Sequence, residues 1–156
     1  MRDPCVHPPE LASRQRWLSV LAKADRAALE AAWGSVADRP GLESLRRPEV
    51  GLVMVRGRTG GTGRRFNLGE MTVTRCALRA PTGVVGHGYV AGRDKRKAEL
   101  VAAFDALLQD AARQEELLRS VVEPLAVAQA AEAVVEARKA AATRVEFFTL
   151  VRGDEG

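Results

Sequence analysis

The 156 residues have the length of one ordinary domain, and an apolar content of 46% is enough to build a buried core. No stretch approaches the roughly 18 apolar residues that a membrane-spanning helix needs, and the N-terminal residues lack the apolar core of a signal peptide. Cys5 and Cys76 lie in no metal-ligand spacing, so we expect a reduced, cytoplasmic protein that is neither secreted nor inserted into a membrane.

The net charge of +4 is distributed unevenly along the chain. Between Leu45 and Lys97 there are 12 basic and 3 acidic side chains, a net charge of +9, whereas the rest of the chain carries −5. A basic segment inside an otherwise acidic chain favours a local anionic partner, such as a phosphate group or an acidic protein surface, over general nucleic-acid coating. Solvated arginines without any ligand would give the same composition.

The N-terminal third predicts an arm followed by two short helices. Residues 1–11 carry three prolines and no periodic pattern, which indicates a flexible arm before a single domain spanning residues 12–156. Ser13 and Asp25 are candidate N-caps, and Pro40-Gly41 should end the second helix. Apolar residues recur at three- and four-residue spacing, namely Trp17, Leu18, Leu21 and Ala22 in the first helix and Leu29, Trp33 and Val36 in the second.

From Glu49 the pattern changes to the alternation of a β-strand. Leu52 and Met54 alternate with Val53 and Val55. Glycines at 57, 60, 61 and 63 predict a turn or wide hairpin loop, and further strands follow, one carrying Met71, Val73, Thr74 and Leu78, the next running from Val84 to Val90. Because parallel pairs need long crossovers, these short connections predict an antiparallel meander.

The C-terminal third predicts helices and a last strand. Asp94 can cap a long helix with an apolar stripe of Val101, Phe104, Leu108 and Ala111. A helical stretch follows at 114–122, and Pro124 suits the start of another helix, which carries Val127, Ala131, Val134 and Ala141. Residues 144–152 are apolar on both strand faces. The sequence thus predicts an α+β fold with an antiparallel sheet of about four strands packed against N-terminal and C-terminal helices.

The run from Arg56 to Phe66 is the most informative local motif. Glycines let a backbone turn with its amides exposed, and guanidinium groups match phosphate or carboxylate oxygens. The candidate anion ligands are Arg58, Gly60, Gly61, Thr62, Gly63 and Arg64. The run is neither a Walker loop nor a dinucleotide-binding fingerprint, and a glycine-rich hairpin turn with solvated arginines would look the same.

A second basic feature lies at the predicted start of the long helix. Arg93 and Lys95 flank Asp94 there, and free amides at a helix N-terminus attract anions. Arg93 and Lys95 are therefore further candidate anion ligands. For Asp94 we favour the role of N-cap.

Candidate catalytic residues are scarce. His87 stands between two glycines without a second histidine, a cysteine or a carboxylate pair at a recognisable distance, and a structural or surface role is the better interpretation. Glu99 and Asp105 are six residues apart on a predicted helix and do not share a face, which makes them a poor acid and base pair. The sequence therefore predicts no catalytic residue and no metal site.

Sequence blocks between residues 13 and 154 together resemble one known family. They are Arg14-Gln15-Arg16-Trp17, Val20-Leu21-Ala22, Gly51-Leu52-Val53, Arg58 to Phe66, Thr72-Val73-Thr74-Arg75, Gly92-Arg93-Asp94-Lys95, Ala98-Glu99, Asp105-Ala106-Leu107 and Arg144 to Asp154. In this order they resemble the PhnG family of the phosphonate carbon-phosphorus lyase system. The sequence departs from the family pattern at Leu150, where we expect Met, and in its proline-rich N-terminal arm.

The resemblance implies a subunit that supports transfer of the ribose 5-triphosphate of ATP to an alkylphosphonate with release of adenine. The product would be α-D-ribose 1-methylphosphonate 5-triphosphate. The implied partners are the H, I and J subunits of the carbon-phosphorus lyase core complex, with the I subunit as the nucleosidase-like catalyst and the J subunit later cleaving the carbon-phosphorus bond. We expect that this chain binds no cofactor and that MgATP is a substrate of the complex as a whole.

Two further expectations concern partners. Phe147 and Phe148, in the doubly apolar last strand, are the candidate contacts to a partner subunit. The basic segment also leaves open an alternative function, a polyanion or RNA-binding module. Against it, Phe66 and Tyr89 are the only aromatic residues in that segment, whereas single-stranded nucleic acids are usually bound on several aromatic platforms.

Overall fold

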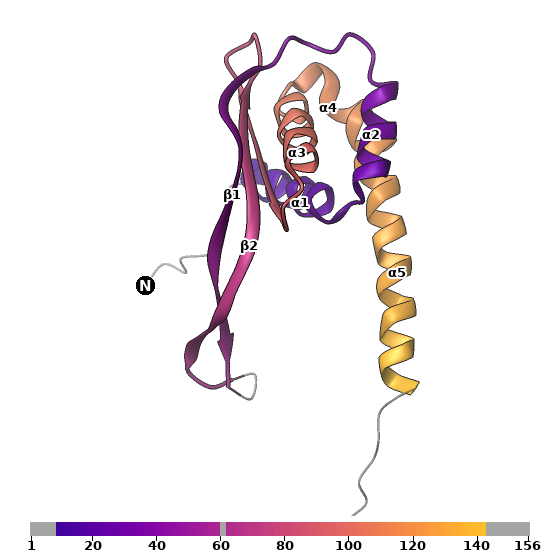
Figure 1. Cartoon of the computed structure of the whole chain (residues 1–156). Coiled ribbons are helices and arrows are strands. Elements are labelled where there is room, and N and C mark those ends of the chain that lie inside the picture. The colour runs from indigo at the N-terminus through magenta and orange to yellow at the C-terminus, as the bar shows by residue number, and fades with distance from the viewer. Residues whose placement is uncertain (1–8, 60–61, 143–156) are drawn as a thin grey trace, which may run out of the picture.

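The computed structural model describes residues 9–59 and 62–142 and has the predicted α+β architecture (Figure 1). Its elements, in order, are α1 (Pro9–Lys23), α2 (Arg26–Ser35), β1 (Glu43–Arg58), β2 (Arg65–Arg79), β3 (Val85–Ala91), α3 (Lys95–Leu108), α4 (Ala111–Leu117), the π-helical segment η1 (Leu118–Val122) and α5 (Glu123–Ala142). The described part contains three strands, and the predicted strand at 144–152 lies outside it.

The three strands form the predicted antiparallel meander in the order β1-β2-β3. The first two strands are longer than the sequence predicts, because they begin at Glu43 and Arg65 and not at Glu49 and near Met71. The first residues of both strands are mostly exposed. Those of β1 are largely polar, and in β2 only Phe66 and Leu68 alternate before Glu70, which is too short a pattern to predict a strand. Residues 52–59 and 62–72 lie beyond the register position of Ala91, the last residue of β3, and are called here the hairpin extension.

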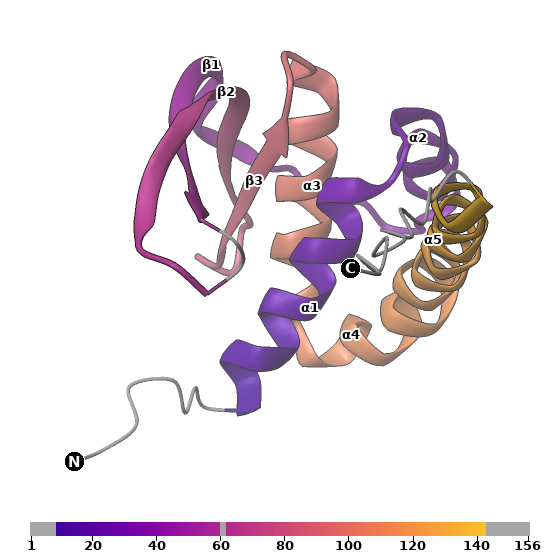
Figure 2. The ribbon, with the colours of Figure 1, turned by 90° about the horizontal axis from the view of Figure 1, so that it is seen from below.

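Helix α3 is the centre of the packing, lying against β3 and β2 (Figure 2). Its predicted N-cap is confirmed, since the Asp94 carboxylate accepts a hydrogen bond of 2.9 Å from the Lys97 amide. Gly86 and Gly88 face this helix, and a Cβ at either position would overlap backbone atoms of α3. Two glycines thus allow the strand to approach the helix closely. Ala111, which was predicted to extend the α3 stripe, is exposed and begins α4.

The core forms where α1 and α2 meet α3. Trp17, Leu21 and Leu29 are buried there beside Phe104, as the helical spacing predicts. The rings of Trp33 and Phe104 meet edge to face, with centroids 5.3 Å apart. These contacts attach the two N-terminal helices to the rest of the domain.

The N-terminal helices differ from their predicted boundaries. Helix α1 begins at Pro9 and not after Ser13, so residues 9–11 are helical although they were assigned to the arm. Proline suits the first turn of a helix, where its missing N–H has no partner to lose. Asp25 occupies the N-cap position of α2 as predicted, but its side chain makes no capping hydrogen bond.

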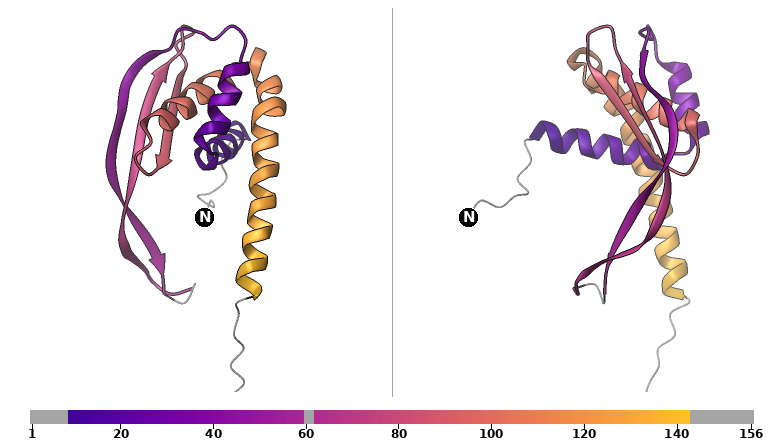
Figure 3. Two further views of the ribbon diagram at one scale, coloured as in Figure 1. Left: turned by 45° about the vertical axis from the view of Figure 1, so that its right-hand side comes forward. Right: turned by 60° about the vertical axis from the view of Figure 1, so that its left-hand side comes forward.

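The last three helical elements, α4, η1 and α5, follow one another without intervening loops. The Glu123 amide bonds to the Leu118 carbonyl, a π-type step just before Pro124. Such a bulge relieves the clash that a proline ring has inside a regular helix. Pro124 is the second residue of α5, so the predicted start of this helix is confirmed to within one residue, although no break separates it from η1. All residues from 130 to 142 of α5 are exposed, including the predicted apolar positions Ala131 and Val134. This exposed part of α5, residues 130–142, and the hairpin extension project in the same direction from the packed helices (Figure 3).

Candidate functional site

The predicted anion-binding loop lies at the tip of the hairpin extension, between β1 and β2. The Gly63 amide donates to the Thr59 carbonyl at 2.8 Å, and the Arg58 guanidinium approaches the Gly63 carbonyl at 3.4 Å. One of the amides expected to face an anion is therefore used to close the loop. Thr62 and Arg64 are exposed, whereas Gly60 and Gly61 lie outside the described residues. Anion binding by this loop stays a prediction.

The arginines of the tip are electrostatically unopposed within the described part of the chain. Arg56, Arg58, Arg64 and Arg65 are exposed, and no ion pair there involves them. Closer to the core, by contrast, Glu49 pairs with Arg75 at 2.6 Å. The tip therefore presents positive charge that another molecule could neutralise.

The second predicted anion site, at the start of α3, has a different character. Arg93 and Lys95 are exposed, but the Asp94 carboxylate already accepts from the helix N-terminus and lies 3.9 Å from the Arg26 guanidinium. A carboxylate in this place repels an incoming anion and occupies an amide that would bind it. The geometry therefore favours capping here over phosphate binding.

The two basic features do not come together. On β2, Val73 pairs with Ala91, which comes just before Arg93. Arg65 lies at the tip, eight residues before Val73 on the same strand. At about 3.3 Å per residue, the tip is roughly 25 Å from the end of β3. The candidate ligands therefore fall into two separate places, and the structure builds no single anion site from all of them.

Asp105 is the most highly connected polar residue of the interior. Its fully buried carboxylate accepts from Arg14 at 3.1 and 2.7 Å, from the indole of Trp17 at 2.9 Å and from the backbone amide of His87 at 2.8 Å. These bonds join α1, β3 and α3 and satisfy a charge that would otherwise be costly to bury. The His87 side chain is exposed and takes no part in these bonds. Asp105 is therefore a structural residue.

The network around Asp105 was not predicted from the sequence, although the sequence contains a signal for it. Asp105 interrupts the apolar run from Val101 to Leu108, and a carboxylate in a buried helix face needs bonded partners. Spacing could have named the position but not the partners, since Arg14 is far away in sequence. In addition, groups of three His, Cys, Asp or Glu placed to hold a metal ion do not occur among the described residues.

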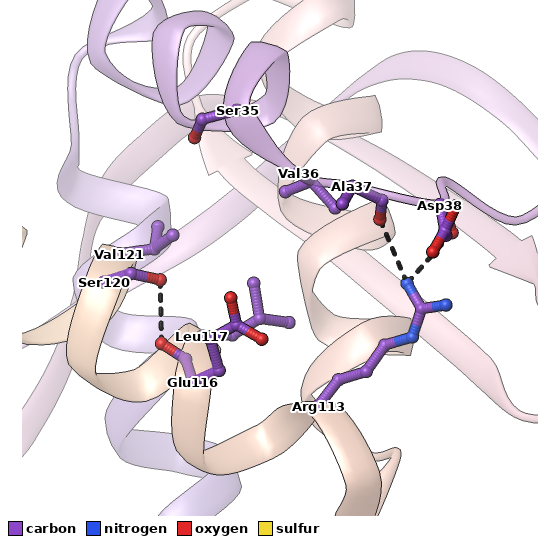
Figure 4. A pocket seen from close by; sticks show the side chains of 9 residues that line it. All are labelled: Ser35, Val36, Ala37, Asp38, Arg113, Glu116, Leu117, Ser120 and Val121. Atoms are coloured by element: carbon purple, nitrogen blue, oxygen red, sulfur yellow. Dashed lines mark hydrogen bonds between the residues drawn. The ribbon is translucent and has the colours of Figure 1, made fainter.

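A pocket of about 250 Å³ opens between the end of α2 and the helices α4 and η1 (Figure 4). Arg113 lies at one side of it and donates to the carbonyls of Ala37 and Asp38 at 3.5 and 3.0 Å, so its charge holds the connecting segment. The pocket is small for an organic ligand and contains none of the predicted site residues. Its lining consists of Ser35, Val36, Ala37, Asp38, Arg113, Glu116, Leu117, Ser120 and Val121.

Comparison with known proteins accounts for nearly the whole chain. The model of the family described as "Phosphonate metabolism protein PhnG" matches residues 12–153. The chain belongs to the PhnG family. Over 145 residues it is also 46% identical to the alpha-D-ribose 1-methylphosphonate 5-triphosphate synthase subunit PhnG of Rhizobium meliloti (strain 1021), a match that covers 93% of this chain and 92% of that protein.

Membership of the PhnG family confirms the resemblance seen in the sequence blocks, and the structure shows what several of those blocks do. The first block supplies Arg14 and Trp17, which both bond to Asp105 from a later block. The block around Asp94 supplies the α3 cap. By contrast, the block from Arg58 to Phe66 lies at the exposed tip, and the last block, with Phe147 and Phe148, is outside the described residues.

No helix among the described residues is long and apolar enough to cross a membrane.

The blocks that resemble the PhnG family divide between the packed interior and the exposed tip. Those in the interior have structural partners within the chain, whereas the arginines at the tip have no acidic partner among the described residues. The tip is accordingly the described part in which a functional role is easiest to place.

Proposed function

We propose that this chain is a subunit of the assembly that makes α-D-ribose 1-methylphosphonate 5-triphosphate, and that it acts only together with other subunits. The observation that carries the proposal is membership of the PhnG family over residues 12–153, with a 46% identical relative that is named as a subunit of this synthase. The partners proposed are the H, I and J subunits, and MgATP is the substrate of the whole assembly.

The proposed reaction is a glycosyl transfer. The bond between C1′ of the ribose and N9 of adenine breaks, and a phosphonate oxygen forms the new bond to C1′. Adenine leaves carrying the proton that the phosphonate gives up, while the 5-triphosphate is untouched. Such a reaction needs an acid for the leaving base and positive charge around the triphosphate.

The side chains of the described residues support a non-catalytic role in this reaction. Asp105 is fully buried and bonded to its neighbours, so it is closed to substrate. The other interior polar residue, Thr74, donates its hydroxyl to the Gly92 carbonyl at 2.7 Å. What the chain presents outward is positive charge at the tip of the hairpin extension. This charge suits an acidic partner surface or the ATP triphosphate.

Reconstitution tests the proposal directly. The H, I and J subunits are incubated with MgATP and methylphosphonate, with and without this chain, and adenine release is measured. We expect adenine only when the chain is present, and none from the chain alone. Equal release without the chain, or turnover by the isolated chain, would refute the proposal.

Paired substitutions separate the two basic features within the same assay. Arg58→Gln with Arg64→Gln removes charge at the tip, and Arg93→Gln with Lys95→Gln removes charge at the start of α3. Because Asp94 already caps that helix, we expect the tip pair to slow adenine release by about tenfold and the other pair by less than about threefold. Equal effects would show that the capped helix start contributes as much as the tip.

The second candidate function is a polyanion or RNA-binding module, which the four exposed arginines of the tip favour. Such binding would depend strongly on salt, because each neutralised phosphate releases counterions. A gel-shift titration with generic RNA at low salt tests it. Absence of binding there would exclude this function.

A further inference from the structure

The two outer edges of the sheet differ in how their backbone groups are satisfied. On β3, the Val85 carbonyl accepts from Arg14 at 3.2 Å and from Gln109 at 3.0 Å, and the His87 amide donates to Asp105 at 2.8 Å. Side chains thus close this edge against strand pairing. On the opposite side, β1 pairs with β2, and no hydrogen bond to its outer edge occurs within residues 9–59 and 62–142.

The direction of the β1 backbone groups follows from the register. The Thr72 carbonyl accepts from the Gly92 amide at 2.9 Å, so Thr72 directs its backbone groups away from β1. Its partner Leu52 is then in a non-hydrogen-bonded pair and directs both its N–H and its C=O to the open edge. The same holds for Val50 and Met54, two residues to either side. The same alternation requires the His87 amide to point away from β2, toward the outer edge of β3, as observed.

The same three residues carry exposed apolar side chains. Val50, Leu52 and Met54 are 42%, 64% and 57% exposed. Unpaired backbone groups combined with uncovered apolar side chains on a long edge strand invite pairing with another strand. The earlier part of β1 is less suitable, because Pro48 lacks an N–H and the register shifts between Ser44 and Arg46 and again between Arg46 and Glu49. The further shift between Val55 and Arg56 places its extra residue, Leu68, in β2 and leaves β1 itself continuous. The usable edge therefore runs from Glu49 to Arg58.

The charge of the hairpin extension indicates what kind of strand would pair with the open edge of β1. Beyond Leu52, the hairpin extension carries four arginines and one acidic residue, Glu70. None of these arginines has an ion pair within the described part of the chain. An incoming strand with acidic residues near the tip would neutralise this charge, whereas a basic strand would be repelled.

We propose that the outer edge of β1, from Glu49 to Arg58, is the docking site for a β-strand of another subunit. The strand pairs with the backbone of Val50, Leu52 and Met54, covers their side chains, and places acidic residues beside Arg56 and Arg58. The proposal rests on the proposed function, because it requires that the chain works in an assembly.

Residue-resolved hydrogen exchange provides the first test, on the full chain alone and in its complex with the H, I and J subunits. In the free chain, the amides of Val50, Leu52 and Met54 should exchange fast, while those of Gly51 and Val53, which bond to β2, should be protected. In the complex the three fast amides should slow by at least about a hundredfold, because they acquire partners.

Two substitutions at one position provide the second test, read as recovery of the other subunits on the tagged chain. Leu52→Pro removes an outward N–H without removing a bond to β2, and should reduce recovery by at least about tenfold. The control Leu52→Thr keeps the N–H and a strand-forming side chain, and should reduce it by less than about threefold. Thermal unfolding of both variants shows that the domain remains folded.

The outcomes separate this inference from the proposed function. If the wild-type chain recruits its partners but the three amides exchange as fast as in the free chain, the edge is not the docking site. Protection of these amides already in the free chain would show that its own C-terminal residues or a second copy cover the edge, which also overturns the proposal. A wild-type chain that recruits no subunit would refute the proposed function itself.

Discussion

The interior around Asp105 and the hairpin extension are both rich in charge, but they use it in opposite ways. In the interior, one carboxylate accepts bonds from Arg14, Trp17 and the His87 amide. In the hairpin extension, arginines face solvent without acidic partners among the described residues. Charge that is bonded within the chain stabilises the fold, and charge left unpaired on a projecting element is available to another molecule. The experiments below test this contrast, beginning with the largest expected effect.

Replacement of the Asp105 carboxylate should cause the largest loss of stability. Asp105→Ala leaves the Arg14 guanidinium, the Trp17 indole and the His87 amide without their acceptor, so the free energy of unfolding should fall by about 3–5 kcal/mol. Urea denaturation measures it. The control is Asp110→Ala, which removes an exposed cap of α4 and should cost about 1 kcal/mol. Similar losses for both variants would contradict the special role of the interior network.

A methyl group at the β3–α3 contact should have the next largest effect. The Cβ of Gly88→Ala would overlap the Ala98 carbonyl oxygen, which forces strand and helix apart. We expect the free energy of unfolding to fall by about 3 kcal/mol. In the hairpin extension, a Cβ at Gly69 meets nothing within 4 Å, so Gly69→Ala should change stability by less than about 0.5 kcal/mol. A tolerated Gly88→Ala would show that the packing is looser than described.

The reactivity of the buried Cys76 thiol also reports on how tightly the interior is packed, with a smaller expected effect. Burial, with a further contribution from Glu99, raises the pKa of Cys76 from 9.0 to about 11. In a Cys5→Ser background, labelling of Cys76 at neutral pH should be at least about a hundredfold slower in the folded than in the urea-unfolded chain. Because the folded state holds this proton more tightly, the stabilisation is present below pH 9 and is lost as pH rises from about 9 through about 11. Rapid labelling of the folded chain would mean that this face of the sheet opens readily.

Removal of charge at the tip should have the smallest effect on stability. Arg58→Gln with Arg64→Gln breaks no ion pair of the described chain, so thermal and urea unfolding should change by less than about 0.5 kcal/mol. The control in the interior, Arg14→Gln, loses charged bonds to Asp105 and should cost about 2 kcal/mol. A large loss for the tip pair would assign those arginines to the fold and not to a partner.

Much of the fold could be predicted, and the errors have physical causes. The order of elements, the antiparallel connections, the Asp94 cap and the core positions Trp17 and Phe104 follow from local periodicity and turn residues. The early parts of β1 and β2 escaped detection because their residues are mostly exposed: residues 43–48 of β1 are largely polar, and in β2 only Phe66 and Leu68 alternate before Glu70. Pro124 correctly indicated the start of α5, but a sequence pattern cannot show that a π-type step joins this helix to the preceding one without a break.

The candidate site was predicted less completely than the fold. Sequence alone marked the glycine and arginine run and the start of α3 as basic features, and the structure separates them by most of the length of the hairpin extension. Distance between such features depends on the strand lengths, which were the poorest part of the prediction. The open edge of β1 had no signal at all, because a strand's neighbours are decided by pairing and not by its own residues.

The sequence by itself determined the family, the α+β class and the identity of the charged residues, since these depend on motif order, local periodicity and composition. Only the tertiary structure decided which charges are bonded inside and which face outward. Asp105 and Arg14 are 91 positions apart, and their contact exists because α1 packs across α3. Burial and pairing are properties of that packing, and they distinguish residues that hold the fold from those that can serve a partner.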